Sequence, residues 1–195
     1  MKIKCLALLP FLAAGLFVPL TQAQVPVFEI TPVQSSIKFD VEASVSVSGT
    51  FDKWNANLTF SSADGSTGVL EITIQADTVN TGSGVKNNKL KSKDFFDAKN
   101  NPLITFKSSK IVPKGGDAYE LPGTFTIRGV SKPETLILTV SGKGTGSGTI
   151  KGTMAFDRKD YGMNSGIPFI KIADRVEVNI DLKAKRVSGP PLTFK

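Results

Sequence analysis

Two pairs of carboxylates offer this sequence a route to catalysis. Asp94 and Asp97 flank two phenylalanines, and Asp157 and Asp160 stand three positions apart later in the chain. Two acids about 5–10 Å apart can hydrolyse a glycosidic bond, as they do in glycosidases. Structural roles fit the same residues better, since Asp94 could cap backbone N–H groups and Asp157 could pair with Arg158 or Lys159. A carboxylate-dependent hydrolase acting on lipids or sugars is therefore an alternative to a non-enzymatic protein.

The absence of histidine excludes most other catalytic chemistry. No histidine occurs among the 195 residues, which removes the usual general base, the Ser-His-Asp triad and the commonest ligand of zinc and haem. The one cysteine, Cys5, lies within residues 1–23. Ser-x-x-Lys pairs occur at Ser35 with Lys38 and at Ser83 with Lys86, about as many as chance gives in a chain this rich in serine and basic residues. We predict no catalytic residue, no metal site and no cofactor.

Residues 1–23 have the composition of a secretory signal peptide. Lys2 and Lys4 form a basic start, residues 6–20 are apolar, and small residues precede Gln24. The apolar run is too short to span a bilayer. We predict export to the periplasm, with secretion as the alternative, and no stable membrane anchor after signal removal. Residues 24–195 are then one domain, which has no thiol and depends on its core for stability.

The charge of the chain is mildly basic. Removal of residues 1–23 takes away two lysines and lowers the formal net charge from +7 to +5. The densest basic stretch holds Lys86, Lys89, Lys91 and Lys93, with no aromatic residue among them on which a base could stack. A soluble surface explains this charge, and we do not expect binding to nucleic acid.

Alternation of apolar and polar residues runs through the chain. Side chains two positions apart in a strand share a face, so such runs indicate antiparallel strands with one wet face and one buried face. The clearest runs cover residues 37–47, 70–74, 136–140, 150–156 and 176–184. Turn clusters separate them, at residues 61–68, 114–117, 142–148 and 162–166.

About eight strands at this spacing predict either a sandwich or a barrel, and the period alone does not choose between them. One short helix is expected over about residues 83–91, just before Phe95 and Phe96. The tail over residues 188–195 is expected to be loosely attached.

Three ordered blocks in the middle of the chain carry a family resemblance. Residues 90–97 read L-x-S-x-D-F-F-D, residues 102–106 read P-x-I-x-F, and residues 123–133 read G-x-F-T-I-x-G-V-x-K-P. This pattern resembles that of the YceI-like lipid-binding proteins. The likeness extends over nearly all of residues 24–195, including Gly49-Thr50-Phe51 and the D-R-x-D-Y-G block at residues 157–162.

The resemblance implies an all-β fold, a lipocalin-like extended antiparallel eight-stranded β-barrel with one short helix and an interior cavity. It also implies a ligand: a polyisoprenoid, a quinone-like lipid or another long-chain amphiphilic lipid, held for transport, storage or sequestration. Relatives place His-Ser where this chain has Ser35-Ser36, and often place histidine where it has Lys89. Any ligand contact that those histidines make is therefore not carried over.

The expected cavity lining is the inward face of the strands together with the Phe pair, and it is expected to hold no ionisable residue. Its members are Phe39, Val41, Ile72, Ile74, Phe95, Phe96, Ile104, Phe106, Phe125, Ile127, Leu138, Met154, Phe156, Val178 and Ile180. Phe95 and Phe96 are expected to close one region of the barrel.

The polar head of a lipid needs a hydrogen-bond donor near the cavity mouth. The candidates are Arg158, Tyr161 and Trp54, with Arg158 first. A surface ion pair with Asp157 or Asp160 is an equally good interpretation of Arg158. A ligandless structural or partner-binding barrel is a further alternative for the whole protein, and a homodimer stays open.

Overall fold

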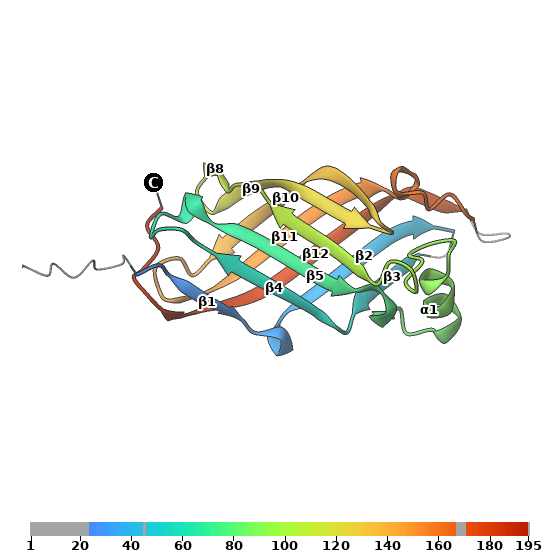
Figure 1. Ribbon diagram of the computed structural model, residues 1–195, viewed down its shortest axis with the longest axis horizontal. Coiled ribbons are helices and arrows are strands. Elements are labelled where there is room, and N and C mark those ends of the chain that lie inside the picture. The colour runs from blue at the N-terminus through green and yellow to red at the C-terminus, as the bar shows by residue number, and fades with distance from the viewer. Residues whose placement is uncertain (1–23, 45, 167–170, 195) are drawn as a thin grey trace, which may run out of the picture.

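Antiparallel strands form one curled sheet in this protein (Figure 1). The computed structural model describes residues 24–44, 46–166 and 171–194, so the predicted signal peptide lies outside the described residues. Within that part of the chain there are twelve strands and one α-helix, and none of its helices is long and apolar enough to cross a membrane. The strands are β1 (Val27–Ile30), β2 (Ser36–Ala43), β3 (Val47–Phe51), β4 (Trp54–Thr59), β5 (Val69–Gln75), β6 (Val79–Asn80), β7 (Leu103–Ser108), β8 (Val112–Gly115), β9 (Ala118–Ile127), β10 (Val130–Ser141), β11 (Ser147–Asp157) and β12 (Ile172–Ser188).

The sheet curls into an extended barrel. Its strand order is β4-β5-β7-β9-β10-β11-β12-β2-β3-β6. β6 follows β5 along the chain after the short 3₁₀ turn η3 (Ala76–Thr78), so its pairing with β3 joins the two sides of the sheet at one end. Strand β1 makes a second connection across the barrel, because it pairs with β12 and also lies against β4. The predicted all-β barrel is confirmed. The count of about eight strands is too low, because strands as short as β1, β6 and β8 hold too few residues to show alternation.

A hairpin interrupts the first alternating run. β2 ends at Ala43 and β3 begins at Val47, so that Val41 faces Val47 across the ladder. The apolar–polar alternation continues through this turn, which is why the sequence gives no sign of it. Ser44 fixes the turn to the start of β12, since its backbone N–H donates to the Lys171 carbonyl at 3.0 Å.

The β9–β10 hairpin turns on two residues with positive φ, Arg128 at 54° and Gly129 at 73°. A two-residue turn of this kind matches the twist of the flanking strands. The Arg128 guanidinium donates to the carbonyl of Gly162 at 2.7 Å and to that of Lys93 at 3.0 Å. The hairpin tip is therefore tied to the segments on both sides of it.

Helix α1 (Gly84–Lys91) lies at one end of the barrel, close to β3 (Figure 1), and confirms the predicted short helix. Ser83 caps it, because the Ser83 hydroxyl oxygen accepts the Lys86 backbone N–H. Lys89 and Lys91 stand in its last turn, where a positive charge is favoured by the helix dipole. The segment after it folds back, with Phe96 N–H donating to the Leu90 carbonyl at 2.9 Å. That turn brings the Phe pair under the helix.

The C-terminal tail is firmly held, contrary to expectation. It lies at the end of the barrel opposite α1 (Figure 1). Thr193 donates its backbone N–H to the Ala63 carbonyl at 2.8 Å and accepts from Gly65 N–H at 2.9 Å. The Phe194 ring lies 6.0 Å from that of Tyr119. Strand-like hydrogen bonds with the turn around η2 (Gly65–Thr67) thus fix a segment whose composition suggested none.

Candidate ligand-binding cavity

The barrel encloses an apolar cavity of about 590 Å³ at the α1 end, called the main cavity below. This volume lies in the range of pockets that bury a small ligand. Inward side chains of β2, β3, β5, β7, β9, β11 and β12 form its wall. The segment over residues 83–96 also lines it, and we call this rim the mouth, because Val85 there is 82% exposed. The predicted residues that line it are Phe39, Val41, Ile74, Phe95, Phe96, Ile104, Phe125, Ile127, Phe156, Val178 and Arg158.

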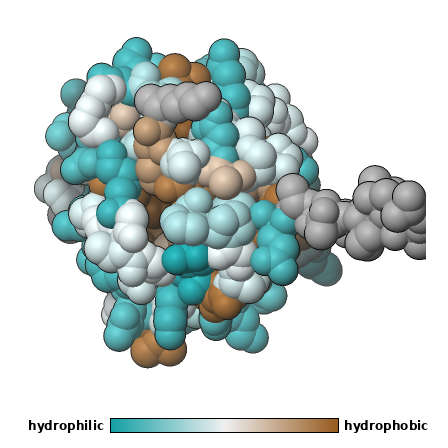
Figure 2. Space-filling model, turned by 90° about the vertical axis from the view of Figure 1, so that its left-hand side faces the viewer, coloured by the Kyte–Doolittle hydropathy of each residue, from teal (hydrophilic) through white to brown (hydrophobic). Residues whose placement is uncertain are grey.

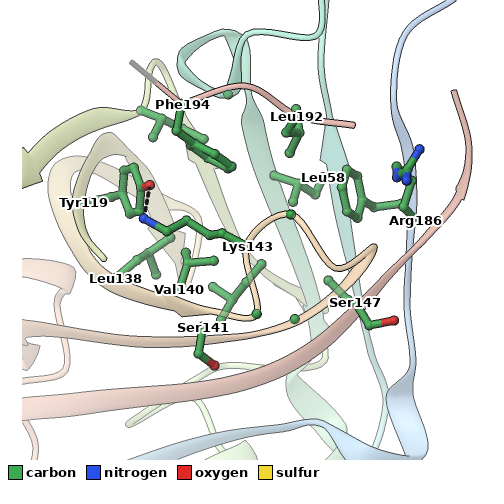
Figure 3. Close-up of a pocket in the computed structure, with 18 of the residues that line it drawn as sticks. Leu58, Tyr119, Leu138, Val140, Ser141, Lys143, Ser147, Arg186, Leu192 and Phe194 are labelled. Carbon is green, nitrogen blue, oxygen red and sulfur yellow. Dashed lines mark hydrogen bonds between the residues drawn. The ribbon is translucent and has the colours of Figure 1, made fainter. Parts of the chain in front are cut away.

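A second, smaller cavity of about 100 Å³ lies at the opposite end, and Leu138 lines it instead. Figure 2, which views that end, shows apolar side chains gathered in a hollow. Leu192 and Phe194 of the tail lie over the hollow (Figure 3). Lys143 lies among them, and its amine contacts Asp117 at 2.7 Å and the Tyr119 hydroxyl at 3.3 Å. The hydrogen bond with Asp117 raises the pKa of Lys143.

Four predicted lining residues lie in neither cavity. Ile72, Phe106, Met154 and Ile180 are buried, and we call them the central layer. Their place follows from neighbours on the same strand faces: on β5, Leu70 lines the small cavity and Ile74 the main one, with Ile72 between. Ten of the fifteen predicted lining residues thus line the main cavity, and the four of the central layer instead fill the middle of the barrel.

Several residues of the main cavity were not among the predicted set. Val47 and Phe51 belong to β3, which the alternation hid, although Phe51 stands in one of the family-like blocks. Met163 follows the 3₁₀ turn η4 (Arg158–Tyr161), where the alternation of apolar and polar residues seen in strands gives no prediction. Lys86 and Lys89 belong to a stretch that the sequence predicts to be solvated surface, yet both line the main cavity.

The Phe pair packs inside the α1 end of the barrel, where both rings line the main cavity. Phe95 and Phe96 are both buried. The Phe96 ring lies 6.4 Å from that of Phe39 and 6.0 Å from that of Phe51. These aromatic contacts fix the ring between the cavity and the base of the helix segment.

Lys89 and Asp94 form an ion pair at the mouth of the main cavity. The Lys89 amine lies 2.6 Å from a carboxylate oxygen of Asp94 and 5.7 Å from the centre of the Phe95 ring. This hydrogen bond holds the pKa of Asp94 below its ordinary value. Asp94 is therefore an ionised partner of a lysine, the opposite of what a general acid requires. The Lys86 amine makes no hydrogen bond or ion pair within the described part of the chain.

Arg158 lines the main cavity, but other groups occupy most of its donors. Its Nε donates to the Ala173 carbonyl at 3.1 Å, its Nη1 to the carbonyls of Met163 and Ser165, and its Nη2 contacts Asp174 at 3.1 Å. Four of the five N–H groups of the guanidinium are thus engaged. The side chain is buried, so the predicted surface pair with Asp157 or Asp160 is wrong. Its partners hold together the two segments that border residues 167–170.

The other two head-group candidates lie outside the main cavity. Tyr161 is fully buried and packs edge-on against Phe125 and Phe156 at 5.5 and 5.2 Å. Its hydroxyl donates to Glu134 at 2.9 Å, and burial, with Glu134, raises the Tyr161 pKa. Trp54 stands on β4 opposite Ile74 and lines neither cavity.

Charged residues do occur on the inward side of one strand. Lys132 and Glu134 share a face of β10 with Leu136 and Leu138. They lie under η4, where Lys132 contacts Asp160 at 3.2 Å and Tyr161 bonds to Glu134. The expectation of an inner face free of ionisable groups is therefore wrong at this end, and η4 supplies the partners that make the charges tolerable.

The candidate catalytic carboxylates are engaged in structural contacts. Asp97 accepts from the side-chain amides of Asn100 and Asn101, and Asp157 caps η4 by accepting the Lys159 N–H at 2.8 Å. Neither member of either predicted pair lines the main cavity. In the described ranges, no three acidic, histidine or cysteine side chains gather as metal ligands would.

Comparison with known proteins decides the family. The model of the YceI-like domain matches residues 28–184. The chain belongs to the YceI-like family. The UPF0312 protein of Pseudomonas aeruginosa is 28% identical over 120 residues, which make up 59% of this chain and 62% of that protein. The UPF0312 protein of Serratia proteamaculans is 32% identical over 96 residues, 49% of this chain and 50% of the relative. The match thus spans about half to three fifths of these curated relatives.

Solved structures share the fold of this YceI-like chain. The crystal structure of Burkholderia cenocepacia BcnA has a TM-score of 0.72 at 28% identity, with 80% of this chain and 99% of BcnA covered. The polyisoprenoid binding domain from Saccharophagus degradans has a TM-score of 0.65 at 16% identity, with 83% and 99% covered. The second likeness concerns the fold alone.

Proposed function

We propose that this protein binds one long-chain apolar lipid in the main cavity. The observation that carries the proposal is the wall of that cavity, an inward surface of Phe, Ile and Val side chains around about 590 Å³. A site of this kind suits a hydrocarbon chain, which needs burial and no directed hydrogen bonds along its length. A polyisoprenoid or a quinone-like lipid is the ligand class that we propose.

The energetics favour a flexible chain bound by its tail. Burial contributes about 0.8 kcal/mol for each methylene group removed from water. Loss of motion in the ligand and of its free translation opposes this gain, so affinity grows with chain length until the cavity is full. The central layer sets where that limit falls, since its four side chains separate the main cavity from the small one.

The family supports the same ligand class. A domain with this fold from Saccharophagus degradans is described as polyisoprenoid binding. We propose that the present protein is likewise a binding protein, which carries, stores or sequesters its lipid after export to the periplasm. The carboxylate contacts described above give no support to a hydrolase.

Extraction of the native protein and uptake of a prenyl probe test the proposal. Organic extraction followed by mass spectrometry should release a long-chain lipid, and delipidated protein should take up a fluorescent prenyl probe. Ile104→Trp should reduce uptake, because the larger side chain fills the main cavity. Ile137→Trp is the matched control, since Ile137 is exposed on the outer face of β10. Absence of both extracted lipid and uptake would favour a ligandless barrel.

A further inference from the structure

The charged residues that line the main cavity are all cationic. They are Lys86, Lys89 and Arg158, and no described carboxylate lines the cavity with them. Helix α1, which carries two of the three, contains no aspartate or glutamate along its eight residues. A ligand head at this mouth therefore meets positive charge on an otherwise apolar site.

Two of these three cations already have partners within the protein. Lys89 forms its ion pair with Asp94 at 2.6 Å. Arg158 gives four of its N–H groups to carbonyls and to Asp174. Both side chains thus have a structural task that does not require a ligand.

Among the described residues, Lys86 is the lining cation that has no ion pair. It stands in the first half of α1, half-buried, and it lines the mouth together with Ser83 and Val85. Its amine has no ion pair or hydrogen bond among the described residues. The flexible stem of a lysine can lie along apolar surface while the amine reaches a polar group beside it. The Lys86 amine can therefore donate a hydrogen bond to an acceptor on a bound ligand.

We infer that the main cavity selects lipids with an anionic head, a carboxylate or a phosphate, and that Lys86 is the head-group contact. The inference rests on the proposed function, because the apolar tail must occupy the same cavity. An anionic oxygen forms a charge-assisted hydrogen bond with the amine, which is stronger than the bond that a neutral hydroxyl or quinone oxygen accepts.

Paired ligands that differ only in the head test the inference. Displacement of a fluorescent lipid gives the affinities of palmitic acid against hexadecanol and of geranylgeranyl phosphate against geranylgeraniol. The wild-type protein should bind the anionic member of each pair roughly tenfold more tightly, the difference between a charged and a neutral hydrogen bond. The two pairs also distinguish a straight chain from a prenyl chain as the preferred tail.

Lys86→Gln should bind both members of a pair with equal affinity. Glutamine keeps a similar helix propensity, so α1 should fold, which a thermal melt checks. Lys93→Gln is the matched control, an exposed lysine that follows the helix and does not line the cavity, and it should keep the preference.

Each other outcome overturns a distinct claim. Equal binding of both heads by the wild type would refute the anionic head and leave the lipid-binding function standing. Failure of all four ligands to bind would contradict the proposed function itself. Retention of the preference in Lys86→Gln, or its loss in Lys93→Gln, would remove Lys86 as the contact.

Discussion

Phe39 of β2 faces Gly49 of β3, and a Cβ atom at position 49 would lie 2.6 Å from two atoms of the Phe39 ring. Residues directly opposite in a ladder point to the same face of the sheet, so both positions look into the barrel. The Phe39 ring therefore covers the glycine and lies against the wall of the main cavity. The absence of a side chain at position 49 leaves the space that the Phe39 ring occupies.

Gly49→Ala should weaken lipid binding more than it weakens the fold. The added methyl group displaces the Phe39 ring, and the main cavity offers space into which the ring can move. We expect a loss of stability below the roughly 1–3 kcal/mol that overpacking costs in a filled core. Urea unfolding and displacement of a fluorescent lipid measure the two effects.

Gly152→Ala is the matched substitution beside the central layer. A Cβ atom at position 152 would lie 2.5 Å from Leu138 Cδ2 and 2.7 Å from Ile180 Cγ1. Ile180 belongs to the central layer, which has no cavity to accept it, so the full cost of about 1–3 kcal/mol is expected. Equal stability losses at positions 49 and 152 would show that the ring of Phe39 cannot move into the cavity.

The sequence could predict which way a strand residue points, but not what it meets there. Ile72 and Ile74 alternate with polar residues on one strand, and both point inward as the period requires. Ile74 lines the main cavity, whereas Ile72 packs in the central layer. The difference depends on side chains from β7, β11 and β12, which no local pattern reports.

The residues near Arg158 in the sequence also do not indicate its ionic partner. Arg158 has acids on both sides of it in the sequence, at Asp157 and Asp160, yet its partner is Asp174. The backbone of η4 points the two nearer carboxylates elsewhere, one to cap the turn and one to Lys132. Long-range packing of β12 against β11 brings Asp174 into reach.

Phe96→Ala should cost less stability than Phe106→Ala. Phe96 borders the main cavity, so its removal enlarges an existing cavity. Phe106 lies in the central layer, so its removal creates a new cavity in a filled region. We expect about 3–5 kcal/mol for Phe106→Ala and a smaller loss for Phe96→Ala. Chemical unfolding compares them. Lipid affinity should fall for Phe96→Ala. If it falls only for Phe106→Ala, then Phe106 and not Phe96 contacts the lipid.

Arg158→Ala should destabilise the protein as well as alter the cavity. The substitution leaves the carbonyls of Met163, Ser165 and Ala173 without their donor, and Asp174 without one cation. A loss of about 3 kcal/mol or more is expected from unsatisfied buried acceptors. Arg175→Ala is the control, because Arg175 is exposed and its side chain forms one ion pair among the described residues, with Glu177, and it should change stability by less than about 0.5 kcal/mol. Similar melting temperatures for the two variants would contradict the structural role.

Asp94→Asn should lower the melting temperature at neutral pH and have a smaller effect in strong acid. The Lys89 amine lowers the Asp94 pKa in the folded state from the ordinary 3.8. A carboxyl whose folded pKa is depressed stabilises the protein above its unfolded pKa, and that contribution is lost as the pH falls through the folded pKa. The difference in melting temperature between wild type and variant should therefore be largest at pH 7 and shrink as the pH is lowered toward 2. Glu71→Gln, which breaks an exposed pair of 3.6 Å with Lys107, should give little change at either pH.

Phe194→Ala should open the small cavity. Its ring covers Gly65, where a Cβ atom would lie 2.6 Å from it, and the Lys143 amine lies 5.4 Å from its centre. Loss of the contacts with Tyr119 and Lys143 should cost about 1–2 kcal/mol and increase binding of an apolar dye, because Leu121 and Leu138 beneath become accessible. Leu103→Ala tests specificity, since Leu103 is 47% exposed against 41% for Phe194 and lines neither cavity. Equal dye binding by both variants would mean that the tail does not close this end of the barrel.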